Sequence, residues 1–216
     1  MDYEQLKKIC KAACHDRNAC KNGFEALLRA NSTEEILAVW KANWDDIYRS
    51  KFSDIMAAHI ADVYSSLRQD FVRNNVFVNE NTEHGLLIVS NPSCKIMVGG
   101  NAKAYLFTAA DIEAYDNAQV YNRTDGSNVL LRGHAHGCFE NGNIVAKEFS
   151  YVKGKFSVCH CHDAADIVCM DGTVIDHGHR RISAHLGSKI YSDISRSIEI
   201  SGQARLYPLC DYYNEK

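Results

Sequence analysis

Histidine and cysteine gather in the second half of this 216-residue sequence. Seven of the ten histidines lie there, and four consecutive residues alternate cysteine with histidine. A further pair of histidines follows one predicted coil, or about sixteen residues, later. These candidate metal ligands are Cys159, His160, Cys161, His162, His177 and His179. Thiolate and imidazole donors suit zinc, which takes four tetrahedral nitrogen or sulfur ligands, so the patch is a candidate zinc site.

Strand alternation works against a shared site, because successive side chains of a strand point to opposite faces. If Cys159 and Cys161 point inward, His160 and His162 point outward, and one ion cannot take all four. Adjacent coils would then place Cys161 beside His177, sixteen residues on. The alternative to a metal site is a set of small core thiols with a solvated histidine face. Outward histidines of this kind would titrate near pH 6.5.

Signatures of catalysis are absent from the sequence. It has no Gly-x-Ser-x-Gly elbow, phosphate loop or dinucleotide fingerprint, and Gly99-Gly100-Asn101 does not extend into the calcium-binding repeat. A Cys–His nucleophile pair stays open, since sequence does not show which side chains are neighbours in space. We therefore expect a protein that is not an enzyme.

Composition and charge limit the classes of partner that the protein is expected to bind. Hydrophobic residues make up 46% and charged residues 24%, as in a folded protein, and the net charge is −3. Because there is no basic excess, a nucleic-acid partner is not expected. No apolar run reaches the roughly 20 residues that span a bilayer, and residues 1–4 show neither the basic nor the apolar region of a signal peptide, so none is expected. With nine cysteines and no such leader, we expect a cytoplasmic protein with reduced thiols and no membrane partner.

The first 74 residues carry a helical pattern of apolar residues. Leu6, Ile9 and Cys10 share one helical face, and Asn22-Gly23 is expected to end that helix. Ser32 to Glu35 form a helix start, in which a hydroxyl cap is followed by acidic residues. Trp40 and Trp44 are expected to anchor the bundle core. A last helix is expected from about Ser53 to Phe71.

An eight-residue repeat takes over after residue 100. The first copies run over 100–107, 108–115 and 116–123, and each opens with small or turn-forming residues before alternating apolar with polar ones. Looser copies continue to Tyr207. The expected inward centres are Ala104, Ile112, Val120, Val129, Gly137, Ile144, Ile167, Ile175, Ile182, Ile190 and Ile198.

Short strands with tight turns bury an apolar face only when copies stack, and a fixed short period indicates a β-solenoid. We expect two strand–turn units of about eight residues per coil, with three per coil and a β-sandwich as alternatives. The predicted fold is α+β, with a small helical N-terminal region (1–74) capping a C-terminal β-solenoid, or single-stranded β-helix (75–216).

The chain also resembles a family of uncharacterised bacterial and mobile-element proteins with a helical N-terminal region and a C-terminal array of Gly-Asn-Ala and Asp-Asn-Ala β-repeats. The matching stretches are 3–8, 21–30, 33–35 and the blocks that begin at Gly100 and Asp116. These motifs are structural, and the resemblance implies no catalytic residue.

The expected role is that of a non-enzymatic interaction or scaffold protein, whose solenoid presents a rigid surface to a protein partner. Tyrosines near the strand ends could line such a surface or pack between coils. Exposed coil edges are templates for strand addition, so a homo-oligomer is also considered. The alternative is a metal- or small-ligand-binding module built on the Cys/His patch around 159–179, with zinc as the metal.

Overall fold

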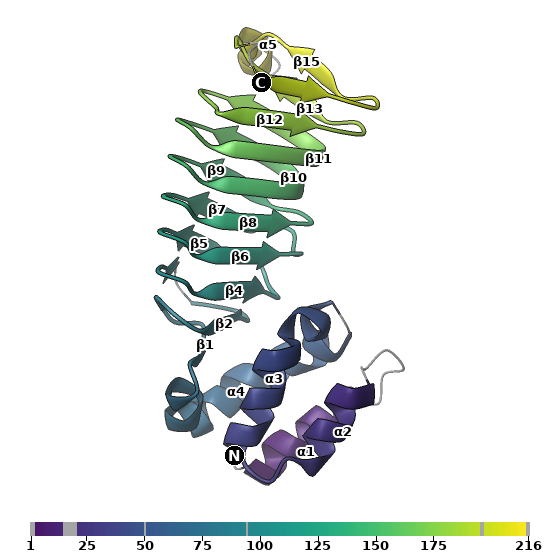
Figure 1. Cartoon of the computed structure of the whole chain (residues 1–216), viewed down its shortest axis with the longest axis vertical. Coiled ribbons are helices and arrows are strands. Elements are labelled where there is room, and N and C mark those ends of the chain that lie inside the picture. Colours follow the sequence, from purple (N-terminus) through teal and green to yellow (C-terminus); the bar gives the residue numbers. More distant parts are fainter. Residues whose placement is uncertain (1–2, 15–20, 50, 94, 195–196, 215–216) are drawn as a thin grey trace.

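The computed structural model describes residues 3–14, 21–49, 51–93, 95–194 and 197–214. Within these residues it shows an α+β protein, in which four N-terminal helices precede a parallel β-solenoid of about seven turns (Figure 1). The helices lie at one end of the rod, and a short last helix lies at the other (Figure 1). Among the described residues, no helix is long and apolar enough to cross a membrane.

The helices follow the expected apolar stripes. They are α1 (Tyr3–Cys14), α2 (Lys21–Arg29), α3 (Thr33–Tyr48) and α4 (Lys51–Arg73). The start of α3 is confirmed, because the Ser32 hydroxyl accepts a hydrogen bond from the Glu35 amide at 3.2 Å, while the Glu35 carboxylate accepts one from the Asn31 amide at 2.6 Å. Asn22 and Gly23 lie in the first turn of α2.

The strands form two parallel sheets that face each other. The first sheet contains β1 (Val76–Val78), β2 (Leu86–Val89), β4 (Lys103–Leu106), β6 (Gln119–Asn122), β8 (His136–Phe139), the first halves of β10 (Tyr151–Cys161) and β11 (Asp166–Asp176), β12 (Arg181–Ala184) and β14 (Ile198–Ile200). The second contains β3 (Ile96–Val98), β5 (Asp111–Ala114), β7 (Asn128–Leu131), β9 (Asn143–Ala146), the second halves of β10 and β11, β13 (Lys189–Tyr191) and β15 (Arg205–Tyr207).

Each coil therefore contains two strand–turn units, as the eight-residue repeat predicts. Ala104 pairs with Val120, and Val120 pairs with Gly137, one coil further on each time. Every paired strand of the described residues runs parallel to its neighbour. A β-sandwich would pair antiparallel strands, and three units per coil would give a third sheet, so both alternatives are wrong.

The corner from the second sheet to the first explains the Asp-Asn-Ala motif. Asp116 takes a left-handed conformation (φ 57°), which asparagine, aspartate and glycine tolerate best. Asn117 then donates its amide to the Gly100 carbonyl of the coil below, at 3.0 Å. Ala118 turns fully inward and closes the turn by donating its amide to Tyr115 at 3.2 Å. The small inward residue keeps the two sheets close together.

One predicted inward position is wrong. Val174, not Ile175, faces the interior, since Val174 pairs with Cys159 and Ile190. Ile175 lies on the outer face. The coils here take fifteen residues, because the chain passes the corner in one continuous strand through Gly172, whose φ is +125°. A Cβ at Gly172 would overlap the Phe156 carbonyl oxygen, so only glycine fits.

The helical region packs against the outer face of the first sheet as well as against the end of the rod. A second hydrophobic core, separate from the solenoid interior, joins residues of α1 to α4 with outward side chains of the first coils. Trp40 and Trp44 are buried in it, as expected. Trp44 meets the ring of Tyr105 edge to face, with centroids 6.0 Å apart.

Candidate functional site: an open trough that ends at three histidines

Three imidazoles meet on the outer face of the second sheet near its C-terminal end. His160 belongs to β10, His162 follows that strand, and His177 follows β11 one coil further on. The rings of His162 and His177 are stacked with centroids 4.5 Å apart and planes 11° apart. The outward direction of His160 and His162 that strand alternation predicts is confirmed.

His160 and His177 are joined by a nitrogen–nitrogen contact. The Nδ1 of His160 lies 3.1 Å from the Nε2 of His177, while the ring centroids are 5.4 Å apart and the planes differ by 5°. The two nitrogens therefore point along the line between the rings, as in an N–H···N hydrogen bond, which needs one donor and one acceptor. Ligands of one metal ion would instead point toward a common third position.

The cysteines of the patch face the other way. Cys159 and Cys161 are buried in the solenoid interior, and burial, followed by the charges of neighbouring groups, raises the pKa of both thiols. Metal binding and nucleophilic attack both use the thiolate, which this setting disfavours. Cys161 pairs in register with Asp176, so the expected pairing of Cys161 with His177 is off by one residue.

His179 has a separate place in the corner of the coil. Its Nδ1 lies 2.8 Å from a carboxylate oxygen of Asp176, and both side chains are essentially fully buried. The Gly178 amide donates to the same carboxylate at 3.0 Å, and the Ser192 hydroxyl also donates to it. These bonds satisfy the buried Asp176 and stabilise the corner.

The six predicted ligands thus fall into three groups: outward imidazoles, inward thiols and one buried histidine. Among the residues that the structure describes, no three His, Cys, Asp or Glu side chains converge as metal ligands would. Zinc binding stays a prediction, and it would require His160 and His177 to turn away from each other.

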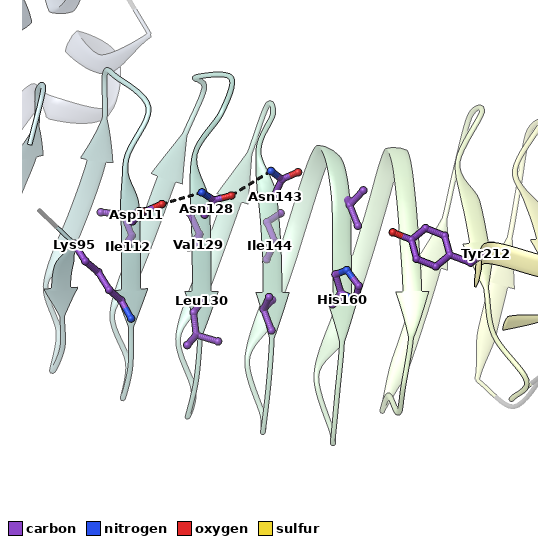
Figure 2. A pocket seen from close by; sticks show the side chains of 12 residues that line it. Lys95, Asp111, Ile112, Asn128, Val129, Leu130, Asn143, Ile144, His160 and Tyr212 are labelled. Carbon is purple, nitrogen blue, oxygen red and sulfur yellow. Dashed lines mark hydrogen bonds between the residues drawn. The ribbon is translucent and has the colours of Figure 1, made fainter. Parts of the chain in front are cut away.

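A trough runs along the outer face of the second sheet, from His160 toward the helical region (Figure 2). One side is a polar ladder: Asn128 donates to Asp111 at 2.8 Å, and Asn143 donates to Asn128 at 3.2 Å. The other side is an apolar ladder that contains Leu130 and Val145. The hollow is open to solvent and holds about 460 Å³.

The two ends of the trough differ in chemistry. Lys95 lies at the N-terminal end, where it forms an ion pair with Glu113. Tyr212, from helix α5 (Leu209–Asn214), lies at the other end, where its ring meets His160 edge to face with centroids 6.4 Å apart. Because α5 contacts β11 and β13, it covers the same sheet face beyond the trough.

Sequence reasoning did not find the trough. Asp111, Asn128 and Asn143 occupy the same position in successive coils, so the recurrence of a small polar residue at the start of every second repeat was the available signal. Tyr212 had no such signal, because it lies beyond the last repeat and reaches the trough only through the fold of α5.

The trough can recognise a ligand by hydrogen bonds from side-chain amides and by apolar contact. In comparisons with known proteins, no family model, curated protein or solved structure matches the chain.

Proposed function

We propose that the protein is a non-enzymatic interaction module, and that the trough on the second sheet binds a segment of a protein partner. The observation that carries the proposal is an outward apolar ladder with no covering element. Leu130 and Val145 are neighbours in one outward row, and Val158 points outward beside them from the row of Asn143, while the described helices cover other parts of the rod. Apolar side chains that line up on an outer face are typical of interaction sites.

The equivalent face of the first sheet supports this assignment. Its first outward residues, Tyr105 and Tyr121, pack against the core of the helical region, and the next positions along the same row are Cys138 and Lys153. The apolar row of the second sheet therefore has no counterpart there. A protein segment fits the trough better than a nucleic acid, because Lys95 is neutralised by Glu113 and Asp111 adds a negative charge.

Helix α5 indicates what kind of segment the trough would accept. Its Tyr212 lies on the same sheet face, where its ring packs against the ring of Tyr191 with centroids 5.3 Å apart and planes tilted by 60°. A partner that presents an aromatic or aliphatic side chain to Leu130 and Val145, with backbone groups toward Asn128 and Asn143, would continue this arrangement.

Affinity capture with matched variants tests the proposal. Val145→Arg places a charge in the apolar ladder, whereas Val168→Arg places one at an outward, partly buried valine of the first sheet. We expect wild type and Val168→Arg to retain the same specific protein from native lysate, and Val145→Arg to lose it. Equal retention by both variants, at equal melting temperatures, would contradict the trough as the binding surface.

The second candidate is a metal- or small-ligand-binding module of the Cys/His patch, and the gathering of the three imidazoles of His160, His162 and His177 on one outer face supports it. Isothermal titration with zinc chloride tests it. Stoichiometric binding that is lost in His177→Gln and kept in His185→Gln would support a site here. No heat of binding with wild type would remove this candidate.

A further inference from the structure

The last coil ends the rod with two strand edges. Among the described residues, β14 pairs only with β12, and β15 pairs only with β13. The outer edge of each strand therefore presents backbone N–H and C=O groups without a strand partner. Such edges are templates for pairing with another chain.

Core side chains are also uncovered at this end. Ile200 is 43% exposed and Leu206 is 40% exposed, although both occupy inward positions of the coil. The residues directly below them in register, Ala184 and Ile190, are 0% exposed. The difference arises because no further coil of the described chain lies above β14 and β15. Exposed apolar groups beside unpaired edges favour association.

The short helix at this end of the rod does not cover the exposed core. Helix α5 contacts β11 and β13, and its Tyr212 lies against outward rings of the second sheet. Tyr212 packs on Tyr191 there, while Ile200 and Leu206 keep their exposure.

The charges on the two edges are complementary. Glu199 points outward from β14, and Arg205 points outward from β15. Glu199 is paired with Arg181 at 2.9 Å on the coil below. Arg205 has no ion pair with any residue in the part of the chain that the structure describes.

We propose that this end of the solenoid binds a second copy of the same chain, tail to tail, with β14 of each copy paired antiparallel to β15 of the other. Each coil runs out along one sheet and back along the other, so β14 and β15 run in opposite directions. A two-fold axis across the rod therefore brings β14 over β15 of the second copy in antiparallel orientation. The contact is closed, since each copy contributes the same surface.

This arrangement accounts for the unpaired strand edges, the exposed core side chains and the complementary charges. The free edges complete two antiparallel pairs, Ile200 and Leu206 of each copy become interior, and Glu199 of one copy lies near Arg205 of the other. Antiparallel neighbours of opposite charge stabilise a strand pair. The proposal does not depend on the trough, which lies on another surface.

Sedimentation velocity and light scattering on the full chain test the dimer. We expect wild type to show twice the mass of one chain, and Ile200→Lys and Arg205→Glu each to show the mass of a single chain with unchanged circular dichroism. Leu28→Lys, at a helix residue that is 41% exposed, is the matched control and should remain dimeric. The double variant Glu199→Arg/Arg205→Glu restores opposite charges across the contact and should recover the dimer.

Several outcomes would overturn the proposal. They are a monomeric wild type at about 100 μM, well above the micromolar range of modest association, an assembly larger than two, or a dimer that Ile200→Lys leaves intact. Hydrogen exchange gives a second measurement, because amides of Ile200 and Leu206 should become protected as the protein concentration rises. Val145→Arg separates this proposal from the trough, since it should abolish partner capture without changing the mass.

Discussion

The hydroxyl of Tyr48, at the end of α3, lies 3.0 Å from the carbonyl oxygen of Leu106 in β4. The same hydroxyl lies 3.1 Å from the carbonyl of Tyr121 on the next coil. One side chain of the helical region thus bridges two coils of the solenoid. Its ring packs edge to face on Tyr105 and Phe107, with both pairs of centroids 5.0 Å apart.

We expect Tyr48→Phe to keep this ring packing and to lower the free energy of unfolding by about 1 kcal/mol, the usual net value of one buried hydrogen bond. Urea denaturation followed by circular dichroism measures the change. Tyr213→Phe, at a tyrosine that is 56% exposed, is the control and should leave the midpoint unmoved. Equal stability of Tyr48→Phe and wild type would show that the hydroxyl contributes nothing to docking.

Gly137 is an inward position where the interior has no room for a side chain. A Cβ there would overlap the ring of Phe139 and come within 2.9 Å of Leu131. We expect Gly137→Ala to destabilise the protein by about 1–3 kcal/mol through overpacking. Gly187→Ala should change stability by less than about 0.5 kcal/mol, because its Cβ would meet Asp171 at an ordinary 3.8 Å.

A double-mutant cycle checks the cause. Phe139→Leu removes the ring that occupies the space a Cβ at Gly137 would need. The loss of stability caused by Gly137→Ala should therefore be smaller in the Phe139→Leu background than in wild type. Additive losses would mean that the glycine is needed for another reason.

The repeat predicted the interior of the rod well because each inward position is a local property of a short strand. Alternation alone placed Cys159 inside and His160 outside. It failed at Ile175, where Gly172 lets the chain turn the corner with one residue fewer. A sequence period does not reveal such a shortened corner, because the strands on either side keep their composition.

The trough could not be predicted in the same way. Asp111, Asn128 and Asn143 form a ladder only because every second strand lies in the same sheet, which depends on the number of strands per coil. Tyr212 completes the trough through a six-residue helix that carries no repeat. That helix is held by the packing of Tyr212 on Tyr191 and by a hydrogen bond from the Leu209 amide to the Asp193 carboxylate at 3.0 Å.

Cysteine labelling should distinguish inward from outward thiols. Cys210 is exposed, whereas Cys159, Cys161 and Cys169 are buried, and burial raises the pKa of Cys169 to about 11. We expect iodoacetamide to modify Cys210 in the native protein and the three inward thiols at least about a hundredfold more slowly, since they must wait for the structure to open. Peptide mapping by mass spectrometry measures each rate.

Exposed Cys138 provides an internal comparison. It points outward, although partial burial raises the pKa of its thiol. It should therefore be labelled more slowly than Cys210 and faster than the inward set. Labelling of Cys161 at the rate of Cys210 in folded protein would contradict the inward placement of the strand.

His162 should make the protein less stable in mild acid. Burial, followed by the charges of His177 and Lys147, lowers the pKa of the His162 imidazole below its usual 6.5, while Asp163 and Asp176 partly oppose this. The unfolded chain therefore takes up a proton near pH 6.5 before the folded chain does. Stability is unaffected by His162 above that pH, and it falls as the pH drops from 6.5 toward the lower folded-state pKa.

Urea denaturation at intervals from about pH 7.5 to about pH 5.5, which spans the usual pKa of histidine, measures this loss. His162→Gln should lose less stability over this range than wild type, because the glutamine does not titrate. Lys147→Gln should give an intermediate loss, since it removes one of the charges that lower the His162 pKa. If His162→Gln and wild type lose stability equally, the acid sensitivity belongs to other groups, and the stacked pair of His162 and His177 does not oppose protonation in the folded protein.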